Sequence, residues 1–152
     1  MGVLTKIWDF ITGGPSRSLV NPVGITTDPD GSIYVVDAAL HLVSVYNRKE
    51  LIFKRLPDDD MVLQAPTSSL ADITTNRLFV SDSAAGVVRL VPLAAKTAPG
   101  EFGKGQLVRP TGLAMNRQTD ELLVVDSRQS MVFRYDRADL TAQCPQSERQ
   151  SD

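Results

Sequence analysis

The chain has 152 residues, of which 42% are hydrophobic and 22% are charged, the composition of one folded domain and not of a disordered chain. Its 16 basic and 18 acidic residues give a net charge of −2, which excludes the strong basic excess that general nucleic-acid binding requires. No apolar run approaches the roughly 18 residues that cross a bilayer, and the single cysteine, Cys144, excludes an internal disulfide and argues against a cysteine-based zinc site. We therefore expect no transmembrane segment, no nucleic-acid partner, and no bound metal or cofactor.

Residues 1–19 are expected to form a lead-in that contains a short helix. Four apolar residues in this stretch have the spacing of one helical face: Leu4, Ile7, Trp8 and Ile11. The Gly-Gly-Pro sequence at residues 13–15 would end such a helix. The alternative is that the same residues form a further β-strand. The segment lacks the residue order of a secretory signal, so a complete chain with this sequence would be cytoplasmic.

Residues 20–142 repeat one unit three times, at residues 20–63, 64–107 and 108–142. A proline marks the start of each unit at a spacing of 44 residues: Pro22, Pro66 and Pro110. An aspartate marks the middle of each unit at spacings of 45 and 44 residues: Asp37, Asp82 and Asp126. Two landmarks rarely stay in step through three units by chance, so we interpret the chain as a repeat protein.

Each unit is predicted to consist of short β-strands. In the first unit the expected strands are residues 23–27, 33–36, 42–46 and 50–56. In the second unit Pro92 and Pro99 bracket a poor fourth strand at residues 93–96, and residues 96–106 are expected to be a long link. In the third unit only residues 140–142 remain for a fourth strand.

A period of roughly 40–50 residues with four strands in each period is typical of a β-propeller blade, so the predicted fold class is all-β with three blades. Residues 143–152 are polar and aperiodic, and we expect a disordered tail there.

In these units the chain resembles the NHL-repeat β-propellers. The first unit matches the pattern of that family at Pro22, Gly24, Ile25, Gly31, Tyr34, Val35, Asp37, His41, Val43 and Tyr46, and the third unit matches it at Pro110, Gly112, Leu113, Asp126, Ser127, Val132 and Tyr135. The second unit departs from the pattern at Ser68, where the family has glycine. The lead-in WDFITGGPSRSLVNPVGI is similar to that of bacterial six-bladed propellers, which are often exported and lipid-anchored.

The resemblance implies half of a six-bladed ring. Either two chains join as a homodimer that completes the ring, or the sequence is a fragment of a longer exported protein, periplasmic or anchored to a membrane by lipid. We favour the fragment over the dimer.

The repeated aspartates are interpreted as structural and not as catalytic groups. Asp37, Asp82 and Asp126 occupy the same place in three blades, whereas a catalytic set combines residues with different roles. An aspartate at the end of a strand can accept hydrogen bonds from the backbone of the following turn. Three further acids, Asp72, Asp120 and Glu121, fall in turns between first and second strands, and we expect them to be solvated acids on the outer rim.

The loops at residues 38–41, 83–86 and 127–130 are expected to share one face of the propeller. This face offers His41, Arg109, Arg128 and Gln129, which would hold a peptide or an anion, the rival interpretation being ordinary solvated loops. The leading functional hypothesis is a noncatalytic module that binds a protein, a peptide or a small molecule. The alternative is part of a lactonase-like hydrolase or a lyase, whose active site would need further blades or a second chain.

Overall fold

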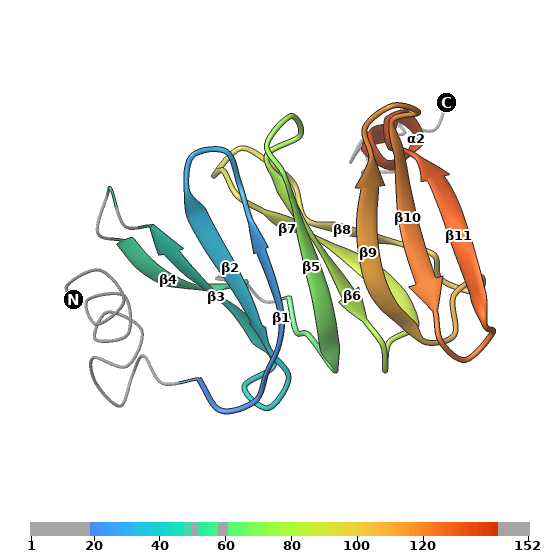
Figure 1. The fold of residues 1–152 in the computed structure, drawn as a ribbon, viewed down its shortest axis with the longest axis horizontal. Helices are drawn as coiled ribbons and strands as arrows, with labels where there is room; N and C mark the ends of the chain where they lie inside the picture. The colour runs from blue at the N-terminus through green and yellow to red at the C-terminus, as the bar shows by residue number, and fades with distance from the viewer. Residues whose placement is uncertain (1–18, 48, 50–51, 58–60, 143–152) are drawn as a thin grey trace, which may run out of the picture.

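The computed structural model describes residues 19–47, 49, 52–57 and 61–142 (Figure 1). The helix expected between residues 4 and 11 and the tail expected at residues 143–152 lie outside the described residues.

Eleven strands in the described residues form three antiparallel sheets, which we call blades 1, 2 and 3. Blade 1 contains β1 (Pro22–Thr27), β2 (Ser32–Asp37), β3 (Leu42–Asn47) and β4 (Ile52–Leu56). Blade 2 contains β5 (Pro66–Asp72), β6 (Arg77–Asp82), β7 (Val87–Pro92) and β8 (Gly100–Phe102). Blade 3 contains β9 (Pro110–Asn116), β10 (Glu121–Asp126) and β11 (Met131–Asp136), which helix α2 (Arg137–Ala142) follows. Strands adjacent in the chain are adjacent in each sheet, and the predicted all-β fold is confirmed as a partial β-propeller.

Two strands differ from the prediction. The fourth strand of blade 2 is Gly100–Phe102, which lies in the expected link and not at residues 93–96. Because it begins after Pro99, neither proline removes an N–H group from its pairing with β7. In blade 3, α2 takes the place of a fourth strand, and Asp136 caps this helix by accepting a hydrogen bond from the Ala138 N–H at 2.8 Å.

The turns repeat as faithfully as the strands. The residue directly before the second strand of each blade has a left-handed backbone: Gly31 (φ 87°), Asn76 (φ 52°) and Asp120 (φ 57°). The same holds directly before each third strand: His41 (φ 56°), Gly86 (φ 66°) and Ser130 (φ 54°). This conformation suits glycine and asparagine, so the three units share a backbone shape even where their residue types differ.

The blades pack face to face through two apolar clusters. The cluster between blades 1 and 2 contains Tyr34, Val36, Val43, Val45, Leu56, Leu63, Leu78, Val80 and Val91. The cluster between blades 2 and 3 contains Phe79, Val88, Leu90, Phe102, Leu107, Leu122, Val124 and Leu140. In both places the first strand of the following blade packs against the first and second strands of the preceding blade. We call the side of a blade that faces the next blade in the chain its downstream face, and the other side its upstream face.

The loops gather at two opposite ends of the blades (Figure 1). The turns between first and second strands lie together with α2 at the upper end in that view, which we call the turn end. The loops between second and third strands lie at the lower end, which we call the loop end. In the described part of the chain, none of the helical structure has the length and apolar character of a membrane span.

Candidate functional site

Asp37 fixes the backbone at the loop end of blade 1. Its carboxylate accepts hydrogen bonds from the N–H groups of Val20 and Asn21, at 2.6 and 3.1 Å. It also accepts hydrogen bonds from the N–H groups of Ala39 and Leu40, at 3.1 and 3.0 Å. One buried carboxylate thus joins the segment that enters the first strand to the turn that follows the second strand.

The aspartates of the other blades have corresponding partners. Asp126 accepts hydrogen bonds from the N–H groups of Val108 and Arg109, at 2.6 and 3.0 Å. The N–H groups of Arg128 and Gln129 each donate to it at 3.0 Å. In blade 2 the aspartate binds the two residues before the first strand at 2.9 Å each.

The environment keeps the carboxylates of Asp37 and Asp126 ionised. Burial by itself raises the pKa of Asp126, but the hydrogen bonds from Val108, Gln129 and Arg109 outweigh it and lower that pKa to about 2. The pKa of Asp37 is also lowered, because the hydrogen bonds from four backbone N–H groups outweigh the effect of burial. All three aspartates are fully buried, and their oxygens face backbone donors of their own blade. This geometry is the one that a structural anchor requires.

His41 is exposed at the loop end of blade 1. It occupies the left-handed backbone position that Gly86 and Ser130 occupy in the other blades. Its position therefore reflects the shape of the turn and does not by itself indicate a binding role. Blade 2 lies between His41 and the three other residues predicted for this face, which belong to blade 3.

Arg109, Arg128 and Gln129 do lie together in blade 3. The two arginines are exposed, whereas the amide of Gln129 donates to the Gln106 carbonyl at 2.8 Å and to Asp126 at 3.1 Å. The predicted loop face therefore offers two arginines that are accessible to an anion, with a glutamine that is already engaged. Binding at this face stays a prediction.

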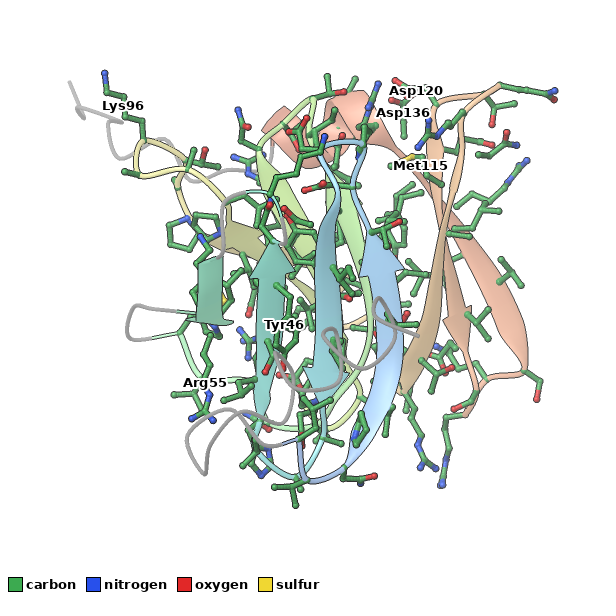
Figure 2. The ribbon with its side chains drawn as sticks, turned by 60° about the vertical axis from the view of Figure 1, so that its left-hand side comes forward. Tyr46, Arg55, Lys96, Met115, Asp120 and Asp136 are labelled. Carbon is green, nitrogen blue, oxygen red and sulfur yellow. The ribbon has the colours of Figure 1, made fainter. Side chains whose placement is uncertain are left out.

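A cavity of about 300 Å³ lies at the opposite, turn end, and we call it the junction pocket. Blade 1 contributes Thr27, blade 2 contributes residues 70–74, and blade 3 contributes Met115 and Arg117. Arg137 of α2 completes its wall. Figure 2 shows Met115 and Asp120 at this end of blade 3. The first strands of all three blades end here, so the pocket exists only because the three blades are packed together.

An ion-pair network crosses the wall of the junction pocket. The guanidinium of Arg137 lies 3.3 Å from Asp72 and 2.7 Å from Asp120. Asp72 also accepts hydrogen bonds from the Thr74 N–H at 3.1 Å and from the Thr75 hydroxyl at 2.8 Å. The expectation that Asp72 is a solvated rim acid is wrong, since this residue is only 6% exposed. Helix α2 explains the difference, because it carries Arg137 over the turn.

The pocket combines apolar and balanced charged surface. Leu70, Ala71 and Met115 supply apolar groups, and Ile73 is 44% exposed at the same site. Two arginines and two aspartates make the charged part: Arg117, Arg137, Asp72 and Asp120. Such a lining suits a small ligand that has an apolar body and a polar or zwitterionic group.

The sequence contains a signal for this arrangement. Asp136 directly before Arg137, with Asp139 in the first turn, is the pattern of a capped helix start. The prediction of a fourth strand at residues 140–142 misses this helix, and with it Arg137 of the junction pocket.

A second, more open hollow of about 520 Å³ lies between the outer parts of blades 1 and 2. Alanine and proline residues form most of its lining, and Lys54 is its one charged residue. Its described lining contains no pair of opposite charges, so it has fewer polar groups that could orient a ligand than the junction pocket has. Within the described residues, no group of three or more His, Cys, Asp and Glu side chains is placed to hold a metal ion.

Solved structures with a similar fold include propellers of two kinds. The chain is similar to a structure of the nidogen/laminin complex, with a TM-score of 0.65, 21% identity and coverage of 80% of this chain and 45% of that chain. It is also similar to a catalytically inactive virginiamycin B lyase from Staphylococcus aureus with quinupristin, with a TM-score of 0.60, 17% identity and coverage of 77% and 38%. A streptogramin B lyase structure gives a TM-score of 0.51 at 16% identity, over 76% of this chain and 40% of that chain.

At these identities the likeness concerns the fold alone, and the chain spans about two fifths of the length of the chains it matches. No family model and no curated protein matches the sequence.

Proposed function

We propose that this chain is a noncatalytic binding module with NHL-like blades, and that the junction pocket is its ligand site. The ligand class that fits is a short peptide segment or a small molecule with an apolar body and a zwitterionic or amide group. The observation that carries the proposal is the pocket itself, a cavity of about 300 Å³ lined by three blades and a helix. This volume lies at the small end of the range for ligand sites, which suits one or two residues of a peptide.

The charges in the pocket support a neutral or zwitterionic ligand. Arg137 already faces two carboxylates, Asp72 and Asp120, so it offers no uncompensated positive charge. Arg117 is exposed and brings a further cation to the rim. A ligand carboxylate would meet Arg117, while a ligand amine would approach Asp120, whose side chain is 53% exposed.

NMR titration with a panel of zwitterionic dipeptides that have one apolar side chain would test the proposal. We expect shifts of the backbone amides of residues 71–74 and 115–117. The variant Thr74→Trp would fill the mouth of the pocket from an exposed position and abolish these shifts. The control Gln118→Trp changes an exposed turn residue that does not line the pocket, and it would leave them in place. Shifts confined to residues 38–41 and 127–130 would move the site to the loop end and contradict the proposal.

The alternative function is that of part of a propeller hydrolase or lyase. Its support is that the chain spans only 38–45% of similar propellers, two of which are lyases, so an active site would be completed by blades beyond these three. Thermal melting in the presence of Ca²⁺ or Zn²⁺ tests whether these three blades already hold the metal of such a site. A melting temperature raised by one ion would favour the enzyme, whereas the binding module would melt at the same temperature with either.

A further inference from the structure

The downstream face of blade 3 is open where the same face of the other blades is covered. In blade 1, Val36 and Val43 are 0% exposed, and in blade 2 Val88 is 0% exposed. Val125 of blade 3 corresponds to Val36 in the repeat, and Val132 corresponds to Val43 and Val88. These two side chains are 42% and 59% exposed, and they face each other across the pair β10 and β11. Blade 3 thus presents the surface of a blade–blade contact without a following blade among the described residues.

Gly112 leaves room for a strand on this open face. In blade 1 the corresponding Gly24 lies against β5, and a Cβ atom placed on it would be 2.9 Å from the Thr67 carbonyl oxygen. A Cβ atom on Gly112 would meet only Val125 of its own blade, at 3.4 Å. The backbone of Gly112 is not left-handed either, so blade 3 itself does not require glycine here. The missing side chain at Gly112 leaves the room that a following strand would need to approach as closely as β5 approaches Gly24.

The first strand of blade 1 presents the complementary surface. Ile25 of β1 is 70% exposed, and Thr27 is exposed next to it on the same side of the strand. The corresponding Leu113 of β9 packs into the cluster between blades 2 and 3. Ala71 of β5, which corresponds to Thr27, packs against the cluster between blades 1 and 2. The upstream side of β1 is therefore a first strand without a preceding blade among the described residues.

We infer that the open face of blade 3 binds β1 of a second copy of this chain. A two-fold axis along the propeller axis would make this contact twice and close the assembly. Two observations select a second copy as the occupant. The chain carries both parts of the contact that it already makes between its own blades, and it covers 38–45% of similar propellers, so two copies together match most of the length of one of them. The inference stands independently of the ligand proposed above.

Multi-angle light scattering after gel filtration, at micromolar concentration, tests the assembly. We expect the wild-type chain to elute with twice the 16.6 kDa mass of one copy. Ile25→Glu and Val125→Lys would each give a monomer, because each places a charge in an apolar contact. An equimolar mixture of the two variants would recover the dimer. One of its two contacts would then pair the introduced carboxylate with the introduced ammonium, and the other contact would be wild type.

Two further variants make the result specific. Gly112→Ala would be folded, since its Cβ atom has space within blade 3, but it would weaken the dimer because β1 could no longer approach closely. Val62→Glu introduces the same charge as Ile25→Glu at an exposed valine that belongs neither to the open face of blade 3 nor to β1, and it would leave the dimer intact. Circular dichroism melting curves would verify that each variant is folded.

Three outcomes would overturn the inference. The first is a wild-type monomer over the whole concentration range, which would mean that a second copy does not cover the open face. The second is a dimer that tolerates both charged variants. The third is a pair of monomeric variants whose mixture stays monomeric, since this would exclude contact between blade 3 and β1.

Discussion

Asp126 shows how much of the loop end depends on one side chain. Four backbone N–H groups, from Val108, Arg109, Arg128 and Gln129, donate to its fully buried carboxylate. We expect Asp126→Asn to lower the free energy of unfolding by about 2 kcal/mol, because the amide keeps one acceptor oxygen and turns an NH₂ group towards backbone donors. Urea unfolding would measure the loss, and Asp30→Asn at an exposed turn would serve as the control. Equal effects of the two substitutions would contradict the role of Asp126 as an anchor.

The same carboxylate predicts how stability depends on pH. The pKa of Asp126 is about 2 in the folded chain, below the value near 3.9 of a free aspartate, so the unfolded chain binds the proton more readily. Its contribution is therefore complete above about pH 5 and is lost as the pH falls through about 4 to 2. Asp37 contributes with the same sign, because its pKa is also lowered. Urea midpoints between pH 6 and pH 2 should fall less steeply for Asp126→Asn than for the wild type, whereas parallel curves would refute the linkage.

Among the secondary-structure elements, helix α2 is held to blade 2 by the ion pair between Arg137 and Asp72, and the exposed pair of Arg134 with Glu121 provides a comparison. Arg137 bridges the buried Asp72 and the turn residue Asp120, whereas Arg134 pairs with Glu121 at 3.9 Å with a side chain that is 72% exposed. We expect Arg137→Ala to destabilise the chain by about 2 kcal/mol, since it leaves the Asp72 carboxylate buried without its cation. Arg134→Ala should cost no more than about 0.5 kcal/mol. Thermal unfolding would compare the stabilities of the two variants. Equal melting temperatures would show that contacts other than the ion pairs of Arg137 hold α2.

The strands show why the sequence predicts some elements and not others. The strands β2, β6 and β10 are short apolar runs that end in aspartate, and repetition of the whole unit makes them plain in the sequence. The fourth strands are weaker in the sequence, because an outer strand is short and pairs on one side only. In blade 2 the pairing depends on Gly100–Phe102 lying opposite β7, which no local pattern reveals. The junction pocket depends on three turns and a helix that are far apart in the chain. The sequence instead points to the loop end, where polar residues such as His41 and Arg128 lie in loops of the repeated unit.

For the whole molecule, the three blades should differ in how readily they open. Every residue of β6 in blade 2 is buried, because blades pack on both of its faces. The strand β11 of blade 3 contains only exposed and half-buried residues. We expect amide hydrogen exchange, followed by mass spectrometry, to be slowest in β5, β6 and β7 and fastest in β11. Uniform exchange over the three blades would mean that they open only together. In the dimer proposed above, protection of β10 and β11 would increase with protein concentration.

The two contacts between blades use different chemistry at one repeated position. At Gly24 the Thr67 carbonyl of blade 2 approaches bare backbone, whereas in blade 2 the corresponding residue is Ser68. There the Ser81 hydroxyl donates to the Thr111 carbonyl of blade 3 at 3.0 Å and lies 2.9 Å from the Thr67 hydroxyl. The three blades share one repeated unit, but their contacts are thus not interchangeable. A duplication that placed a second blade 2 before the present one would press the Cβ atom of its Ser68 against the Thr67 carbonyl oxygen. Blade 2 therefore cannot follow itself, and this contact constrains the order of the blades.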